Sequence, residues 1–488
     1  MVANGTEGRH FGRVSQRFVV DAAIFIAAFF AGFVIRFQED WWLAFADHWV
    51  GISIGAVFYS CVAYIFGFYS FNGIPRNAIN RFLAVCGAVG LSALLILGFF
   101  YLFQVESFGR GAMALGAVFA IIGLAGNYTA LRHREERFRE RMLVILTCSD
   151  DEHELMLNRR LWEPGLELVG VVATEEYHPG EGLKVLGKIK DLPEIARREE
   201  VARVVCAESC ITEAGNFRLF SELRYSGVLV MPLISLCEEF YQFIPLGLVS
   251  PTWLLAASGS PRLTYIRKMK RAFDIVFSLL VLVALSVPFV IGMILVRLTS
   301  KGPIFYRQIR SGRFGQKFAM LKLRTMRVDA EKAGAQWAQD KDPRVTPVGG
   351  FLRKYRIDEI PQLLNVLTGH MSLVGPRPER PEFVDKLAER IPYFQERLMI
   401  QPGITGCAQV KYPYGANIED TRKKLEYDLY YMKHMSLLLD LFILLDTVRT
   451  ILTGGLGQKA REQAPHYHTR RSGEAIVADH ETETASAR

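Results

Sequence analysis

Two adjacent carboxylates surrounded by cations are the strongest chemical signal in this sequence. Asp358 and Glu359 follow a basic stretch at 353–356, and a later loop holds Arg377 between two prolines. A carboxylate flanked by cations is expected to stay ionised at neutral pH, and the same cations would attract phosphate. The pattern therefore predicts a small site that an anionic nucleophile, a hard metal ion and phosphate groups could share.

A helix and a loop are the elements that must position this pair. Apolar residues recur at helical spacing over 360–367, Pro361 suits a first helical turn, and Gly369 ends the pattern. The carboxylates are thus expected at a helix N-terminus, the end that favours anions. An alternative needs no catalysis, because Asp358 could be an N-cap and Glu359 a partner of the helix dipole.

The stretch Leu352 to Pro378 resembles the bacterial sugar transferases, through the runs Arg-x-x-x-x-Asp-Glu-Ile-Pro-Gln-Leu-x-Asn-Val and Met-Ser-Leu-Val-Gly-Pro-Arg-Pro. These are monotopic polyprenyl-phosphate sugar-1-phosphate transferases, which start exopolysaccharide and O-antigen repeat units. The resemblance extends over about Lys270 to Gly457. Its other segments are Lys-Arg-x-Phe-Asp (270–274), Gly-Pro-Ile-Phe-Tyr-Arg-Gln (302–308), Leu-Lys-Leu-Arg-Thr-Met (321–326) and Gln-Pro-Gly-Ile-Thr-Gly (401–406).

The resemblance implies a reaction with a UDP-sugar donor and a polyprenyl phosphate acceptor. Asp358 would be the nucleophile that carries the sugar phosphate after UMP leaves. Glu359 would assist catalysis and bind Mg²⁺ together with Asp440, since Mg²⁺ takes carboxylates and phosphate oxygens. The residues implied in phosphate and substrate binding are Lys322, Arg324, Arg353, Arg377 and Gln409. A direct single-step transferase and a non-catalytic scaffold for polysaccharide enzymes are the alternatives.

Lys322 and Arg324 are two positions apart in an expected extended segment, so their side chains should point the same way. The functional interpretation is that both face phosphates. A solvated or lipid-headgroup face would explain each residue singly.

Composition favours a membrane protein. The chain has 488 residues, half of them apolar, and a formal net charge of +8. A modest positive charge suits a cytoplasmic face that meets anionic lipid or phosphate-rich substrates. No basic run is interleaved with aromatic residues, which argues against nucleic acid as a partner. The seven cysteines are odd in number and lack a Cys-x-x-Cys pair, so neither a disulfide framework nor a zinc site is expected.

Long apolar runs near 18–35, 50–71, 82–103 and 113–131 each have about the 20 residues that a membrane-spanning helix needs. Basic residues gather before the first, after the second and after the fourth run. The positive-inside rule therefore predicts four spans with both ends in the cytoplasm of a bacterium, in its inner membrane. Asp21 near one end of the first run is expected to snorkel to the interface.

Alternating strand and helix patterns follow, and they predict a parallel Rossmann-like sheet. The expected strands are 142–147, 166–173, 203–207 and 228–232, with a short strand or turn at 185–192; the expected helices are 150–161, 195–200 and 214–225. The first strand–helix turn at 147–152 contains three acids and no glycine, so a dinucleotide site is not expected. The module resembles the CoA-binding-like domain of larger family members.

Phe273–Leu298 is long enough to cross a bilayer but has basic residues on both flanks. Ser286 and Pro288 lie near its middle, where proline breaks the helix and a serine hydroxyl can satisfy a freed carbonyl. We therefore expect a re-entrant hairpin on the cytoplasmic face; a kinked spanning helix is the alternative. The apolar segment 237–257 could pack on the membrane or on the catalytic part.

These patterns divide the chain into a multi-domain membrane protein. A four-helix transmembrane anchor is expected over 1–135, a degenerate Rossmann-like α/β domain over 140–260, an α+β interfacial transferase domain over 262–457, and a disordered tail over 458–488. The sequence leaves open a homo-oligomer, downstream glycosyltransferases as partners, and the identity of the sugar.

Overall fold

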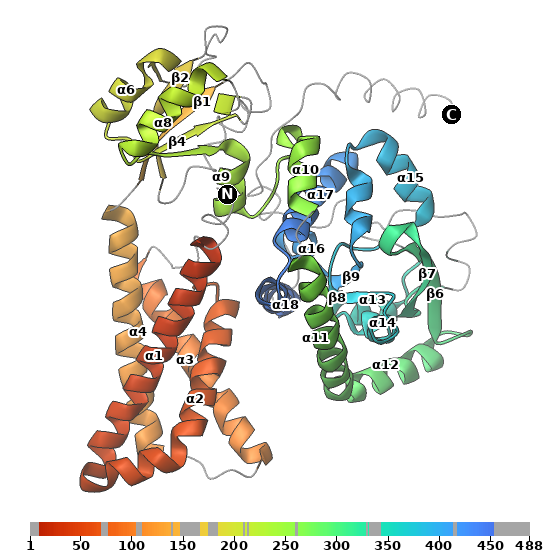
Figure 1. Cartoon of the computed structure of the whole chain (residues 1–488). Coiled ribbons are helices and arrows are strands. Elements are labelled where there is room, and N and C mark those ends of the chain that lie inside the picture. The colour runs from red at the N-terminus through yellow and green to blue at the C-terminus, as the bar shows by residue number, and fades with distance from the viewer. Residues whose placement is uncertain are drawn as a thin grey trace. The chain divides into compact units, whose positions relative to one another are not determined.

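The structure is a computed structural model of the chain. It describes residues 9–69, 77–103, 110–137, 140–146, 166–173, 184–207, 210–211, 214–258, 262–327, 330, 343–412 and 417–452. The chain divides into two compact units, Met1–Phe240 and Tyr241–Arg488, which are described separately (Figure 1).

Four long apolar helices open the first unit and pack as a bundle (Figure 1). They are α1 (Arg9–Phe37), α2 (Trp41–Ile65), α3 (Ala78–Phe103) and α4 (Arg110–Arg137). The 3-10 turn η1 (Gln38–Asp40) folds α2 back onto α1, and α4 packs along α1 as well. Within the described part, three stretches are long and apolar enough to cross a membrane: Val14–Ile65, which covers most of α1 and all of α2, Ala78–Phe99 and Gly111–Arg134.

The bundle encloses a polar group that was expected at its edge. Asp21 is fully buried and accepts hydrogen bonds from Tyr69 Oη (2.7 Å), Asn127 Nδ2 (3.1 Å) and Tyr128 Oη. The prediction that Asp21 snorkels to the interface was therefore wrong. Three donors from other parts of the bundle satisfy the carboxylate inside, so it has no need to reach water.

A five-stranded parallel sheet forms the rest of the first unit, in the order β3-β2-β1-β4-β5. The strands are β1 (Glu140–Leu146), β2 (Leu166–Ala173), β3 (Val185–Lys188), β4 (Arg203–Cys206) and β5 (Leu229–Pro232). The helices and 3-10 turns between them are η3 (Ile189–Asp191), α6 (Leu192–Arg198), η4 (Ala214–Asn216) and α8 (Phe217–Tyr225), and α9 (Leu233–Tyr241) follows. The Rossmann-like parallel sheet is confirmed.

The core of this sheet domain lies between the strands and α6 and α8. Leu143 and Val204 of the strands, Ile195 of α6 and Leu223 of α8 are buried together there, among other apolar side chains. The predicted helix 150–161 and the turn 147–152 lie outside the described residues. Both expectations for these residues therefore stay predictions.

The second unit begins with a segment that packs on the predicted transferase domain, residues 262–457. It comprises the end of α9, η5 (Leu246–Leu248) and α10 (Pro251–Ser258). The Leu246 amide donates to Glu426 (3.1 Å), and Lys433 lies over the Trp253 ring, 4.9 Å from its centroid. Of the two alternatives for this apolar segment, the contacts favour packing on the catalytic part.

A bent pair of apolar helices follows. The helix axis bends by 64° between α11 (Arg262–Ala284) and α12 (Ser286–Thr299). The break lies at Leu285, and the Ser286 hydroxyl donates to the Val283 carbonyl (2.8 Å), as the sequence predicted for a carbonyl freed at the bend. Pro288 sits in the first turn of α12, where its missing N–H has no helical partner to lose.

Two small sheets surrounded by short helices complete this unit (Figure 1). β6 (Phe305–Ser311) and β7 (Lys317–Leu323) are antiparallel, whereas β8 (Ser372–Val374) and β9 (Gly403–Thr405) are parallel. The 3-10 turns are η6 (Arg313–Gly315), η7 (Ile357–Glu359) and η8 (Phe394–Met399). The helices are α13 (Pro347–Lys354), α14 (Gln362–Leu367), α15 (Pro381–Arg390), α16 (Cys407–Lys411), α17 (Ile418–Lys433) and α18 (Leu437–Leu452).

Both outer ends of the bent pair are anchored in this same core. Near the end of α12, Val296 is buried against Leu323 of β7 and Leu352 of α13. Near the start of α11, Lys270 forms an ion pair with Asp440 of α18 (2.6 Å). The pair therefore leaves the catalytic part at one end and returns to it at the other.

Candidate active site

Asp358 and Glu359 lie in η7, just before α14 begins. The chain reaches this turn through Arg356, whose φ of 57° is uncommon for a residue other than glycine. The sequence placed the two carboxylates at a helix N-terminus, and the structure places them in a separate tight turn in front of it. Such backbone conformations persist only where the surrounding structure holds them in place, and they are concentrated at functional sites.

Three cations surround the carboxylate of Glu359, which is only 8% exposed. Lys322 Nζ lies 2.9 Å from Oε1, Arg356 Nη1 lies 3.4 Å from Oε2, and Arg377 Nη2 lies 3.7 Å from Oε1. Burial raises the pKa of Glu359, but these cations outweigh burial and hold the pKa below its usual range. Glu359 is therefore ionised at neutral pH.

Asp358 is also buried, but its contacts differ from those of Glu359. Its Oδ1 atom is shielded from solvent and has no hydrogen-bond partner. Burial and the adjacent Glu359 raise the pKa of Asp358, although Lys322 and Arg353 oppose them. The flanking cations therefore outweigh burial at Glu359, but they do not outweigh it at Asp358. Neighbouring carboxylates whose environments push their pKa values apart are typical of active sites.

Arg353 and Lys322 complete the charge around the pair. Arg353 Nε donates to Thr325 Oγ1 (2.8 Å), which fixes the guanidinium next to η7. Burial lowers the pKa of Lys322, and Glu359 offsets part of this effect. The four cations Lys322, Arg353, Arg356 and Arg377 outnumber the two carboxylates. This excess positive charge suits a ligand with several phosphate charges.

The loop that carries Arg377 is held by hydrogen bonds at each of its carbonyls. The donors to the successive carbonyls of Pro376, Arg377, Pro378 and Glu379 are Gly403 N (2.9 Å), Arg397 Nη2 (3.1 Å), Arg310 Nη1 (3.0 Å) and Ser311 N (2.9 Å). A Cβ on Gly375, at the start of the loop, would lie 2.3 Å from the Gln401 carbonyl oxygen, so only glycine fits. The side chain of Arg377 therefore projects from a fixed backbone.

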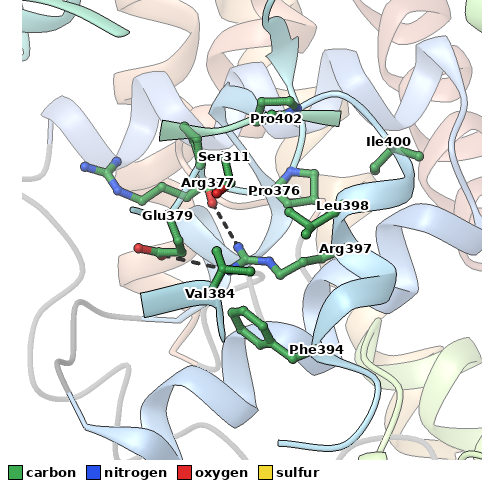
Figure 2. A pocket seen from close by; sticks show the side chains of 12 residues that line it. Ser311, Pro376, Arg377, Glu379, Val384, Phe394, Arg397, Leu398, Ile400 and Pro402 are labelled. Atoms are coloured by element: carbon green, nitrogen blue, oxygen red, sulfur yellow. Dashed lines mark hydrogen bonds and ion pairs between the residues drawn. The ribbon is translucent and has the colours of Figure 1, made fainter. Parts of the chain in front are cut away.

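A buried arginine lies behind this loop and lines a pocket beside Arg377 (Figure 2). Arg397 is 7% exposed, and its Nη2 lies 2.8 Å from Asp428 Oδ2. A weaker contact joins Arg397 to Glu379 at 3.9 Å. Burial raises the pKa of Asp428 to about 6, although Arg397 opposes the rise. Sequence reasoning missed Arg397, because nothing local connects it to the Arg377 loop.

The structure brings most of the implied site residues together. Gln409 joins the cluster because its Oε1 accepts a hydrogen bond from Arg377 Nη1 (3.0 Å). Arg324 is directed elsewhere and donates to the Ser300 carbonyl at the end of α12 (2.8 Å). Arg356, which the sequence showed only as part of a basic stretch, emerges as a direct partner of Glu359. Its position beside the carboxylate pair was the available signal.

Asp440 has partners that differ from those implied for it. It accepts a hydrogen bond from Tyr431 (2.7 Å) besides its ion pair with Lys270, and it is fully buried. Both carboxylate oxygens are thus engaged. The Lys-Arg-x-Phe-Asp segment holds α11 in the core: Lys270 binds Asp440, and Asp274 accepts from the Leu373 amide (3.2 Å).

The donors for a metal ion are few in the part of the chain that the structure describes, which contains no group of three or more His, Cys, Asp or Glu residues suited to a metal. Mg²⁺ typically uses one or two protein carboxylates and takes its remaining ligands from phosphates and water. The unpartnered Oδ1 of Asp358 fits that requirement. Cations contact both oxygens of Glu359, and an ammonium and a phenol occupy those of Asp440, so either residue would have to give up a contact to bind a metal ion.

The fold and the site together define a membrane-associated protein with a cation-rich carboxylate pair next to a bent apolar helix pair. Residues 265–454 match the bacterial sugar transferase family, and residues 64–231 match a CoA-binding domain family. The chain is 30% identical to the UDP-glucose:undecaprenyl-phosphate glucose-1-phosphate transferase of Klebsiella pneumoniae, over 89% of this chain and 94% of that one.

Two further relatives match this chain over very different lengths. The enzyme with the same description in Xanthomonas campestris pv. campestris is 29% identical over 90% of this chain and 93% of its own. The UDP-N-acetylgalactosamine-undecaprenyl-phosphate N-acetylgalactosaminephosphotransferase of Aeromonas hydrophila is 46% identical, but over 38% of this chain and 44% of that one. This chain therefore spans less than half the length of the Aeromonas relative. The chain belongs to the bacterial sugar transferase family.

Proposed function

We propose that the protein transfers a sugar 1-phosphate from a UDP-sugar to undecaprenyl phosphate, as the first membrane step in assembling a polysaccharide repeat unit. The observation that carries the proposal is Asp358 Oδ1, a buried carboxylate oxygen with no hydrogen-bond partner, set among cations that suit a diphosphate. The relatives named as undecaprenyl-phosphate sugar-phosphate transferases support the substrate class.

The reaction proceeds in two displacements at phosphorus. Asp358 Oδ1 attacks the β-phosphorus of the UDP-sugar, the bond from that phosphorus to the bridging oxygen breaks, and UMP leaves with the electron pair. A phosphate oxygen of undecaprenyl phosphate then attacks the same phosphorus and releases the Asp358 carboxylate. Covalent catalysis replaces one difficult transfer by two easier ones. A carboxyl whose pKa is raised is a stronger nucleophile once ionised.

The surrounding side chains bind and orient the phosphates. Arg377 and Arg353 present planar guanidinium groups suited to phosphate oxygens, and Lys322 adds a point charge. Glu359 stays ionised and holds Lys322 and Arg377 in place between turnovers. A divalent ion such as Mg²⁺, held by Glu359 with phosphate oxygens, would neutralise charge on the diphosphate.

The anchoring of the bent helix pair supports a membrane arrangement for this reaction. The start of α11 and the end of α12 both pack into one core, which supports a re-entrant hairpin that we place on the cytoplasmic side. Basic residues on both flanks support the same side. The four helices α1 to α4 each span the inner membrane, and the hairpin keeps η7 near the headgroups, where a lipid phosphate can reach Asp358.

Trapping of the covalent intermediate tests the proposal. Purified protein is incubated without acceptor with a UDP-sugar labelled in its β-phosphate, then denatured. The wild type should retain label on protein and release a stoichiometric burst of UMP, and Asp358→Asn should do neither. Asp385→Asn removes an exposed carboxylate of α15 and should behave like the wild type.

Two outcomes decide against the mechanism. If the Asp358→Asn protein still retains the label, Asp358 is not the nucleophile. Lipid product formed by the wild type with no protein-bound label at any time would favour a single-step transfer. A non-catalytic scaffold, by contrast, would release no UMP with any of a panel of UDP-sugars, and the same panel identifies the sugar.

A further inference from the structure

A second pocket lies at the start of α11, and the proposed reaction does not use it. Its lining includes Arg267, Lys270, Arg271, Arg313, Gln401 and Tyr431. Four of its lining residues are cations, and Asp274 is its one acidic member. The residues come from α11, η6, the segment between η8 and β9, and α17, so the pocket forms only in the folded second unit.

Two of the four cations are already neutralised or engaged. Lys270 is paired with Asp440 at 2.6 Å. Arg271 donates to the Val366 carbonyl (2.5 Å) and to the Leu367 carbonyl (2.8 Å). Each of these contacts joins α11 to another element of the core, so the side chains of Lys270 and Arg271 are held in position.

Arg267 and Arg313 remain as surplus positive charge. Within the described part of the chain, neither forms an ion pair with a carboxylate; Arg313 Nε donates only to the Met399 carbonyl (3.2 Å). Burial, and then the nearby Arg267, lower the pKa of the Arg313 guanidinium. Two guanidinium groups that repel each other across a pocket are stabilised by an anion between them.

The position of the pocket along α11 indicates where that anion comes from. The next turns of the helix expose apolar side chains, with Val276 59%, Leu280 62% and Val283 74% exposed. Tyr265, on the other side of Arg267 in sequence, is 68% exposed and suits a membrane interface. Arg267 therefore lies where a helix passes from headgroups into hydrocarbon.

We propose that this pocket binds the phosphate of a membrane phospholipid headgroup between Arg267 and Arg313. The inference rests on the proposed insertion of the α11–α12 hairpin in the membrane, but not on the transfer reaction. The bound lipid tethers the catalytic part at a fixed depth.

The site is distinct from the one that receives the acceptor. Arg271 contacts the C-terminal end of α14, whereas Asp358 precedes its N-terminal end. A helix of six residues separates the two ends by roughly 9 Å at about 1.5 Å per residue. Moreover, none of the cations around Glu359 lines this pocket.

Native mass spectrometry of the full-length protein, delipidated in detergent and titrated with phosphatidylglycerol, tests the proposal. The wild type should retain a bound lipid that diacylglycerol with the same tails does not replace. Arg267→Gln and Arg313→Gln should each weaken retention by about tenfold or more, because each removes a charge-assisted hydrogen bond. Lys268→Gln, an exposed neighbour outside the pocket, should match the wild type.

Competition separates the sources of phosphate. The proposal is overturned if both arginine variants retain phosphatidylglycerol as well as Lys268→Gln does. It is also overturned if inorganic phosphate at the same concentration as the lipid displaces it. It is also overturned if undecaprenyl phosphate displaces phosphatidylglycerol with equal potency, since the pocket would then serve the acceptor. UMP release is measured separately; a protein that binds the lipid but releases no UMP would refute the proposed reaction and leave this inference standing.

Discussion

Arg397 offers the sharpest test of how the site is held, because it touches the backbone of Arg377 and none of the reacting groups. Arg397→Met keeps most of the apolar stem but removes the donor to the Arg377 carbonyl and the ion pair with Asp428. The Arg377 loop would then lose one of its hydrogen bonds from the protein core. We expect Arg397→Met to lower kcat/KM for the UDP-sugar through displacement of Arg377.

The magnitude follows from the role of Arg377. A charge-assisted contact of the kind Arg377 makes is worth roughly 1.5–3 kcal/mol, so Arg377→Ala should lower kcat/KM by about 10–150-fold. A misplacement of about 1 Å can cost up to roughly 100-fold. Arg397→Met should therefore cost about 10–100-fold, and no more than the loss of Arg377 itself.

A double-mutant cycle distinguishes positioning from an independent effect. In the Arg377→Ala background, Arg397→Met should lower kcat/KM by less than about threefold, because there is no guanidinium left to misplace. UMP release at varied UDP-sugar concentration gives kcat/KM for all variants. Arg390→Met, an exposed arginine of α15, is the matched control and should match the wild type. If the fold losses in kcat/KM of the two single variants multiply in the double variant, Arg397 does not act through Arg377.

Stability gives an independent readout of the same variant. Removal of Arg397 leaves Asp428 buried without its cation, which costs roughly 3–5 kcal/mol while the carboxylate is ionised. The pKa of Asp428 is already raised to about 6, and it rises further without Arg397. The native state then binds a proton that the unfolded state releases, so Arg397→Met should regain stability as the pH falls from 8 to 6. Thermal unfolding at both pH values measures this; equal losses at both would contradict it.

The remaining predictions concern charge, packing and metal. Lys322 lowers the pKa of Asp358, so Lys322→Met should raise it further and move the acidic limb of the pH–rate profile to higher pH; an unshifted limb would contradict this. Gly349→Ala would place Cβ 2.0 Å from the Thr325 carbonyl oxygen and should unfold the domain at lower temperature, whereas Gly350→Ala meets open space in the same helix and should stabilise by about 0.5–1 kcal/mol. EDTA should abolish UMP release and Mg²⁺ should restore it; release that persists in EDTA would exclude an essential metal.

The sequence predicted the fold where local patterns carry it. β2 was expected at Leu166–Ala173 and lies there, because a strand inside a parallel sheet reads as a nearly continuous apolar run. The break in the α11–α12 pair was likewise visible from Ser286 and Pro288. What local patterns could not show is which charged groups meet inside the bundle. Asp21 was misjudged for that reason, since its partner Tyr69 and its α4 donors lie far away in the sequence.

The site was predictable only in part, for the same physical reason. Asp358, Glu359 and Arg353 lie within one short segment, so their clustering is a local property of the sequence. Lys322 and Gln409 entered through the family resemblance and lie at the cluster. A late acidic residue such as Asp440 fits a metal site and a buried ion pair equally well on sequence alone. Its pairing with Lys270 is a long-range contact that only the fold decides.

The packing of α12 bears on why a turn, and not a long helix, carries the proposed nucleophile. Gly292 of α12 is buried, and a Cβ there would lie 3.2 Å from Cγ2 of Ile357, the residue before Asp358. α12 thus packs directly against η7, and Leu352 and Leu323 contact the same position of α12. A long helix at this point would carry its carboxylates away from α12, whereas a tight turn keeps them beside it. In the proposed reaction, the lipid phosphate and the soluble donor could therefore meet at one carboxylate while the lipid stays in the membrane and the donor stays in water.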